Sequence, residues 1–346
     1  MAVALIGLGM VSRTHVKAIS EAAQGITLKG VLSRSPSRAG EYARSLAAEL
    51  GYAPKAYENL REVAEDRDID FAIVCTPPNA RSEIVSTLAR AKKHILLEKP
   101  IERTLAAAED IVENCAAQGV LLGVVFQHRM RASARRLSER LAEGSLGRIA
   151  AVEITVPWWR PQSYYDEPGR GSYARDGGGV LISQAIHTLD LALSLAGPVG
   201  KVQALASTTA LHRMESEDFV SAGLVFESGA VGSLVASTAS FPGRAESIVL
   251  HCEKASASLT SGKLELAWHD GRVETFGEEG GTGSGADPMA FTHAWHQAII
   301  ENFADAVAGK TTPACTGQQA LLVHAVIDAL VRSSAEGRAV HLSGSR

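Results

Sequence analysis

The chain has 346 residues, 46% of them hydrophobic and 21% charged, which is enough for about two domains with buried cores and argues against disorder. A formal net charge of −4, with no basic block, argues against a nucleic-acid-binding surface. The four cysteines lack CxxC spacing, and no apolar run reaches the ~18 residues that span a bilayer, so we expect reduced thiols, no metal site, no membrane contact and a cytoplasmic location.

The first 145 residues alternate short apolar runs with helical patterns. This alternation predicts a parallel sheet covered by helices on both faces. The expected strands are Val3–Ile6, Ile26–Leu32, Phe71–Cys75, His94–Leu97 and Val120–Phe126, and the expected helices lie near 10–22, 37–50, 58–65, 80–91 and 104–118.

From about residue 147 the pattern changes to period-two alternation, interrupted by one helical stretch at Gly178–Ala196. Turns at Glu227–Gly229 and His269–Gly271 predict hairpins of an antiparallel sheet. The glycine-rich loop Gly277–Gly285 precedes two long helical patterns. The expected strands are 151–156, 199–211, 218–227, 230–239, 246–252, 256–260, 263–268 and 271–276, and the last helices 288–309 and 317–336.

These patterns together predict an α/β protein of two domains. Residues 1–125 form an N-terminal Rossmann domain with a parallel sheet. Residues 126–346 are expected to form an α+β domain with a large, mostly antiparallel sheet. The pattern leaves the last two helices free to pack back on the first domain.

The segment Gly7-Leu-Gly9-Met10-Val11-Ser12 follows the first strand and opens a helix. It is GxGxxG with serine in the third place. Gly7 allows the tight turn, and Gly9 lets the backbone approach a pyrophosphate held at the helix N-terminus. We therefore predict dinucleotide binding at Gly7, Gly9, Met10 and Val11, rather than a merely structural turn.

The end of the second strand distinguishes NAD from NADP. An acidic residue there would bind the ribose 2′-hydroxyl of NAD. This chain has Ser33 and Arg34 instead, with Arg38 one turn later. Guanidinium groups suit a 2′-phosphate, so we favour NADP over NAD. The alternative is that both arginines belong to a solvated helix face.

Glu98-Lys99-Pro100 follows the fifth strand. Ligands of open α/β sheets bind beyond the carboxyl ends of the strands, so Lys99 is expected beside the cofactor, where it could exchange a proton with a substrate oxygen. An ordinary exposed turn is the alternative.

A second polar cluster lies on the helix predicted at Gly178–Ala196. Ser183 and Gln184 stand four and three residues before His187, so all three can face one way, off the apolar stripe. The glycines Gly177–Gly179 would let another backbone or a ligand come close. An ordinary polar helix face is the competing interpretation.

Aromatic and cationic residues precede this helix. Aromatic faces suit sugar C–H surfaces, and arginine suits a carboxylate or phosphate; a packed loop or subunit contact is the alternative. The expected substrate-binding residues here are Trp159, Arg160, Tyr165 and Arg170. His293 and His296 have no third ligand at suitable spacing, so we interpret them as surface or core histidines.

Four motifs occur in the order seen in the Gfo/Idh/MocA oxidoreductases, which the whole chain resembles. They are Gly7-x-Gly9-xx-Ser12, Glu98-Lys99-Pro100, Phe126-Gln-His-Arg129 and Gly177-Gly-Gly-x-Leu-x-x-x-x-x-His187-xx-Asp190. The resemblance implies a Rossmann domain joined to a domain whose open sheet forms homodimers or homotetramers. It also implies NAD(P)-dependent redox chemistry at a carbinol of a sugar, inositol or related polyol.

The resemblance further implies roles for individual residues. Lys99 and His187 are the implied catalytic pair, and the Pro100 peptide bond is expected to be cis. The implied cofactor contacts include Thr76, Pro77, Glu98 and Gln127, while Ser183 and Gln184 are expected near the substrate.

The chain departs from the family pattern at two positions. Ser183 stands where many members have aspartate, and Arg81 where histidine is frequent. The Ser183–His187 segment looks closer to members acting on sugar nucleotides or aminosugar acids. Two other functions stay open: a redox-neutral glycosidase or lyase that uses bound NAD transiently, and a non-catalytic dinucleotide-binding regulator.

Overall fold

The structure, a computed structural model, describes residues 1–23, 25–278 and 292–342. It comprises two compact units, Met1–Gln127 with His293–Leu321, and His128–Thr292 with Leu322–Arg346. Most of the predicted loop Gly277–Gly285, and the start of the helix predicted at 288–309, lie outside the described residues.

The first unit contains a parallel sheet, which in the described part of the chain has six strands in the order β3-β2-β1-β4-β5-β6. This is the doubly wound order, whose direction of winding reverses between β1 and β4. The central strands are buried on both faces, as their continuous apolar runs predict. The strands are β1 Ala2–Ile6, β2 Thr27–Leu32, β3 Lys55–Tyr57, β4 Phe71–Val74, β5 His94–Leu97 and β6 Leu122–Val124.

Helices of the first unit begin at the signals that the sequence carries. Ser35 and Thr104 each accept a backbone N–H three residues later, which caps α2 and α6. The helix predicted at 37–50 is two helices, and the short edge strand β3 was not predicted. The helices are α1 Ser12–Ser20, α2 Pro36–Ser45, α3 Ala47–Leu50, α4 Leu60–Glu65, α5 Arg81–Arg90, α6 Leu105–Ala117 and α10 Ala294–Val307, with the 3₁₀ turn Pro78–Ala80 before α5.

The second unit contains a sheet of nine strands among the described residues, in the order β14-β13-β12-β11-β7-β10-β9-β8-β15. All neighbours pair antiparallel except β7 and β10. The prediction of a large, mostly antiparallel sheet is confirmed. The strands are β7 Ile149–Pro157, β8 Val199–Ser207, β9 Phe219–Phe226, β10 Val231–Ser237, β11 Ser247–Cys252, β12 Ala255–Thr260, β13 Lys263–Trp268, β14 Val273–Phe276 and β15 Val340–His341.

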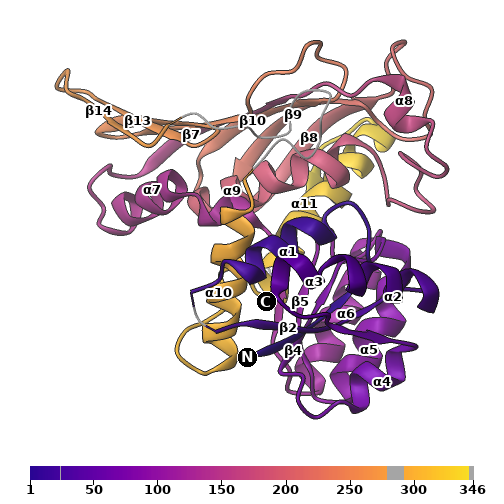
Figure 1. Cartoon of the computed structure of the whole chain (residues 1–346). Helices are drawn as coiled ribbons and strands as arrows, with labels where there is room; N and C mark the ends of the chain where they lie inside the picture. The colour runs from indigo at the N-terminus through magenta and orange to yellow at the C-terminus, as the bar shows by residue number, and fades with distance from the viewer. Residues whose placement is uncertain (24, 279–291, 343–346) are drawn as a thin grey trace. The chain divides into compact units, whose positions relative to one another are not determined.

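Two helices of the second unit lie along one face of this sheet. α9, Ile186–Ala196, packs on β7 and β11, and α7, Ala132–Ala142, packs on β12 and β13 (Figure 1). α8 covers Gln162–Tyr165, and the long helix α11, Gly317–Glu336, contributes residues to both units. Within the described ranges, none of the helices combines the length and apolarity needed to cross a membrane.

The helix predicted at Gly178–Ala196 is not uniformly α-helical. A π-helical turn occupies Leu181–Ala185 before α9 begins at Ile186. α9 is buried around nearly its whole circumference, and the expectation that Ser183, Gln184 and His187 share one polar face stays a prediction. The glycines before this helix do allow another backbone to come close, as predicted: a Cβ on Gly179 would overlap the carbonyl oxygen of Glu217. The carboxylate of Glu217 accepts hydrogen bonds from the backbone N–H groups of Gly179 and Leu181.

Candidate functional site

The loops that follow the parallel strands carry the residues expected to bind a dinucleotide. Because all six strands run parallel, their carboxyl ends lie at one edge of the sheet. Segments 7–11, 33–34, 76–77, 98–99 and 126–127 follow β1, β2, β4, β5 and β6 in turn. The first unit therefore gathers the predicted cofactor contacts at this edge.

Gly7 and Gly9 serve different needs. Gly7 has φ +94°, and a Cβ there would lie 2.8 Å from the backbone of Cys75 and Thr76, so the turn after β1 requires glycine. A Cβ on Gly9 would meet no atom of the described residues within 4 Å. Protein packing therefore does not explain Gly9, whereas close approach of a pyrophosphate does.

Two buried polar atoms at the same edge also fit a bound ligand. Oγ1 of Thr76 and Oε1 of Gln127 have no hydrogen-bond partner among the described residues. Buried polar groups are normally paired, so these atoms are available to a ligand. Met10 is largely exposed. Val11 occupies the N-cap position of α1 without a side-chain hydrogen bond, so the free N–H groups of this helix terminus are suited to an anion.

The end of β2 presents cations and a hydroxyl rather than a carboxylate. Ser33 is half-buried, while Arg34 and Arg38 are exposed. One Nη of Arg38 donates to the carbonyl of Leu8 at 2.7 Å, which ties this arginine to the glycine turn. Arg34 belongs to the same edge through its place directly after β2.

The turn after β5 is fixed from two sides. The Lys99–Pro100 bond is cis, as expected, and the backbone N–H of Lys99 donates to Oε2 of Glu98 at 3.2 Å. The buried guanidinium of Arg81 donates to the carbonyls of Glu98 and Pro100 and, at 2.7 Å and 2.9 Å, to that of Thr76. Arg81 therefore joins the ends of β4 and β5, a role that its position in the sequence did not reveal.

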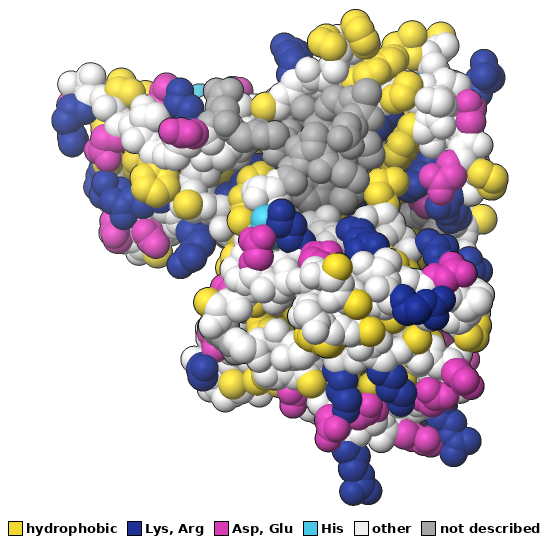
Figure 2. Space-filling model, in the orientation of Figure 1, with side chains coloured by type: hydrophobic (Ala, Val, Ile, Leu, Met, Phe, Trp, Pro, Cys, Tyr) yellow, Lys and Arg dark blue, Asp and Glu magenta, His cyan; other side chains and the backbone are white. Residues whose placement is uncertain are grey.

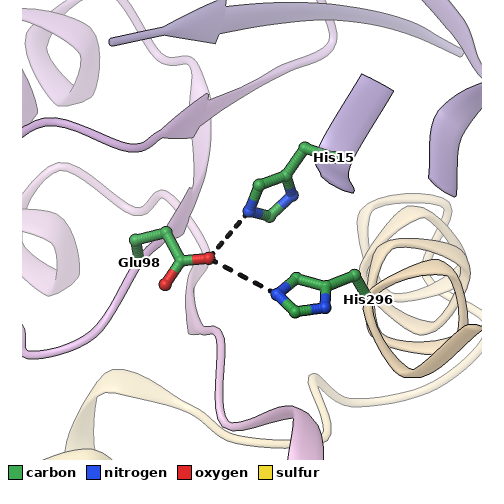
Figure 3. A group of neighbouring side chains, drawn as sticks. All are labelled: His15, Glu98 and His296. Atoms are coloured by element: carbon green, nitrogen blue, oxygen red, sulfur yellow. Dashed lines mark hydrogen bonds and ion pairs between the residues drawn. The ribbon is translucent and has the colours of Figure 1, made fainter. Parts of the chain in front are cut away.

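Glu98 is the centre of a buried group of three side chains that the sequence did not predict (Figure 3). Nε2 of His15 on α1 lies 2.7 Å from Oε1 of Glu98, and Nε2 of His296 on α10 lies 3.7 Å from the same oxygen. The two imidazole rings meet edge to face at 5.1 Å. The available sequence signal was weak: one histidine a turn beyond the glycine motif and one in the last part of the chain.

The charges in this group stabilise one another. Burial alone would raise the pKa of Glu98, but hydrogen bonds from His15 and His296 outweigh it and hold that pKa well below its usual value. Burial opposes protonation of His15, yet Cys75 and Glu98 raise its pKa to about 10. For His296 burial wins and lowers the pKa. Glu98 is thus held as a carboxylate beside His15, whose pKa is raised, and His296, whose pKa is lowered.

In the second unit, His187 lies at the first turn of α9 and is buried. Its ring lies 5.0 Å from that of His128 at an angle of 31°. His128 is in turn 2.6 Å from a guanidinium nitrogen of Arg131, which pairs with Glu246 at 2.7 Å. Three residues after His187, Asp190 takes two hydrogen bonds of 2.7 Å from Arg129. The Arg131–Glu246 ion pair therefore lies beside His128, and the Arg129–Asp190 ion pair lies one turn after His187 on α9.

The predicted substrate residues of the second unit fall into two groups. Nε2 of Gln184 lies 3.4 Å from the hydroxyl of Tyr164, whose ring is covered by the guanidiniums of Arg160 and Arg170. Oε1 of Gln184 is buried without a partner among the described residues. Tyr165 instead turns its hydroxyl to Thr238 at 2.6 Å in the interior. Trp159 packs against Phe241, and Ser183 is half-buried within the π turn.

Two family models match the chain, and together they span most of it. Residues 1–126 match "Oxidoreductase family, NAD-binding Rossmann fold", and residues 134–258 match "GFO/IDH/MocA C-terminal domain".

Curated relatives and a solved structure agree with these matches. A myo-inositol 2-dehydrogenase of Thermotoga maritima is 29% identical over 236 residues, 67% of each chain. A 1,5-anhydro-D-fructose reductase of Ensifer adhaerens is 25% identical over 98% of this chain and 97% of the relative. The WlbA dehydrogenase of Bordetella pertussis, solved with NADH and UDP-GlcNAcA, is 27% identical with a TM-score of 0.81 over 99% of both chains.

The two glycines of the first turn lead to opposite expectations. Gly9→Ala should leave the unfolding temperature unchanged, because a Cβ there meets only open space, but should weaken NADH binding about tenfold or more by obstructing the pyrophosphate. Gly7→Ala should lower the unfolding temperature, because φ is positive and the backbone of Cys75 is in the way. Thermal melts and NADH fluorescence titrations measure both effects. A Gly9→Ala protein that binds NADH normally would contradict this placement of the dinucleotide.

Proposed function

Because the chain belongs to the Gfo/Idh/MocA oxidoreductases, we propose that it transfers a hydride between a nicotinamide dinucleotide and a carbinol or carbonyl of a sugar, sugar derivative or polyol. The observation that carries this proposal is the braced Lys99 turn at the carboxyl edge of a Rossmann sheet whose glycine turn leaves room for a pyrophosphate. The nicotinamide supplies or accepts the hydride.

We assign to Lys99 the role of hydrogen-bond donor to the reacting oxygen of the substrate. Its ammonium donates a hydrogen bond to that oxygen and so stabilises the negative charge that the oxygen carries while the hydride is transferred. The fixed backbone of residues 98–100 supports this role, because a hydrogen-bond donor is effective only when it is held in position.

We assign to His187 the role of general base or acid, which accepts or donates the proton of the same oxygen. This role is supported by the ring of His128, which lies 5.0 Å from that of His187, and by the Arg129–Asp190 pair, which anchors α9 one turn later. Imidazole exchanges protons near neutral pH, which suits general acid–base catalysis.

The remaining contacts suit a polar, sugar-like molecule. The buried and available Oε1 of Gln184 can accept a substrate hydroxyl. Arg160 and Arg170 lie over the ring of Tyr164, a combination that binds an anionic group beside an apolar sugar face. Trp159, Tyr165 and Ser183 complete the assigned substrate-binding residues. These features favour a sugar derivative that carries a carboxylate or phosphate.

Replacing either assigned catalytic residue should abolish most of the turnover. We expect Lys99→Ala and His187→Ala each to lower kcat about 10²–10⁴-fold while the proteins stay folded and bind NADH. The exposed residues Lys17 and His269 supply control variants, Lys17→Ala and His269→Ala. A panel of polyols, aldoses, uronic acids and sugar nucleotides, followed at the nicotinamide absorbance, identifies the substrate for this measurement. Normal turnover by both folded variants would refute the roles.

We further propose that NADP is preferred over NAD. The end of β2 has no carboxylate to bind a ribose 2′-hydroxyl, and Arg34 is exposed beside it. Wild-type protein should bind NADPH more tightly than NADH, and Arg34→Ala should lose about tenfold of its NADPH affinity with little change for NADH. Arg44→Ala, in the last turn of the helix α2 that follows Arg34, is the control. Arg38 is less suitable for this test because it also holds Leu8. Equal or tighter binding of NADH by the wild type would contradict the preference.

The open face of the nine-stranded sheet supports assembly into a homodimer or homotetramer. Leu205, Ser221, Val235 and Thr155 pair side by side across four strands and so share one face, on which Leu205 is 63% and Val235 40% exposed. Light scattering should give a multiple of the 36.5 kDa chain mass, and Leu205→Glu with Val235→Glu should reduce it to the monomer. Leu211→Glu, at an exposed loop position, should not. A monomeric wild type would refute the proposal.

The cysteines support a cytoplasmic location for the enzyme. All four are free thiols, and three of them are buried. Reduced thiols are typical of the cytosol.

A further inference from the structure

Glu98 uses its two carboxylate oxygens in different directions. Oε1 faces His15 on α1 and His296 on α10 (Figure 3). Oε2 accepts the backbone N–H of Lys99 at 3.2 Å. One buried carboxylate therefore connects two helices to the backbone of the lysine that follows it.

The same helix α1 also presents the dinucleotide-binding turn. Its N-terminus follows Gly9 directly, and His15 lies one turn further, with its backbone N–H on the carbonyl of Val11 at 3.3 Å. The imidazole of His15 is fully buried and reaches Oε1 of Glu98 at 2.7 Å. Its side chain is thus placed to act on Glu98 rather than on a bound pyrophosphate.

We propose that His15, supported by His296, is a positioning residue for the reaction: it fixes the Glu98 carboxylate and thereby the direction in which Lys99 presents its ammonium. The inference rests on the proposed function, because it takes Lys99 as the group that contacts the substrate. The bond is also a strong one: His15 and Glu98 meet at 2.7 Å, and hydrogen bonds to a carboxylate are about twice as strong as neutral ones.

The three groups are also of the types that bind zinc. Two ligands of a tetrahedral zinc ion lie about 3.3 Å apart when each is ~2.0–2.1 Å from the metal. The 2.7 Å between His15 and Glu98 is instead the distance of a direct charged hydrogen bond. The geometry therefore favours mutual positioning, and metal content becomes an outcome of the test.

The test separates the loss of positioning from the loss of cofactor binding. His15→Leu removes the donor and the charge, whereas His15→Gln keeps an amide donor near the place of Nε2. His296→Leu leaves the His15–Glu98 bond intact. The control is His293→Leu, which breaks a 2.6 Å histidine–carboxylate contact with Glu21 between the same two helices, away from Glu98.

We expect His15→Leu to lower kcat about 10–100-fold, the effect of a misplaced reacting group, with the dissociation constant of NADH changed less than twofold. His15→Gln should recover part of the rate, His296→Leu should lose less than tenfold, and His293→Leu should stay near the wild type. Because His15 acts through Lys99, adding His15→Leu to Lys99→Ala should lower the residual rate no further. If His15→Leu does not fold, His15→Gln and His296→Leu carry the same test.

Several results would overturn the inference. These are a wild-type kcat in the His15 variants, a loss of NADH affinity equal to the loss of kcat, or a full additional loss in the Lys99→Ala background. One equivalent of zinc in the purified protein, with activity lost on its removal, would also do so. An active Lys99→Ala protein contradicts the proposed function itself, whereas an inactive one beside a fully active His15→Leu contradicts only the positioning role.

Discussion

The negative charge of Glu98 is buried at the end of β5, and the surrounding structure must compensate it. An unpaired carboxylate in the interior costs several kcal/mol or changes its protonation state. Glu98 stays ionised because His15, 83 residues away on α1, and His296 on α10 face one of its oxygens. This requirement gives a physical reason why α10, from the last part of the chain, belongs to the first unit with α1 and β5.

Much of the fold was predictable because its signals are local. Apolar runs of four to seven residues fix the buried parallel strands, and Ser35 and Thr104 fix two helix starts within three residues of themselves. The turns at Gly229 and Gly271 join the antiparallel strands as expected. The glycine turn and the Lys99–Pro100 turn follow their strands directly, so strand positions alone place them at the carboxyl edge. Interspersed charges of both signs on the visible surface of the first unit agree with its ordinary composition (Figure 2).

The unpredicted features depend on contacts between distant residues or on small changes of helical phase. Nothing near Arg81 in the sequence indicates that its guanidinium bridges Thr76 to the turn at 98–100. The stack of His128 on His187 joins residues from different elements. The π turn at Leu181–Ala185 rotates Ser183 relative to His187. A sequence analysis that assumes 3.6 residues per turn cannot detect such a change of helical phase. Periodicity thus predicts elements better than it predicts which polar groups meet.

Each unit has a buried ion pair within three residues of its proposed catalytic side chain: His15–Glu98 beside Lys99, and Arg129–Asp190 near His187. The two pairs differ in whether hydrogen bonding or burial dominates the pKa of the carboxyl group. Around Glu98 the hydrogen bonds outweigh burial, so its pKa falls. At Asp190 burial outweighs the two bonds from Arg129, so its pKa rises. For the Arg129–Asp190 pair, desolvation thus offsets much of the attraction between the two charges, as is common for buried ion pairs. Both pairs fix the local geometry. Each carboxylate accepts two hydrogen bonds, so neither its side chain nor the backbone that carries it can turn freely. The buried charges are best understood as orienting Lys99 and His187, with stabilisation of the fold a secondary effect.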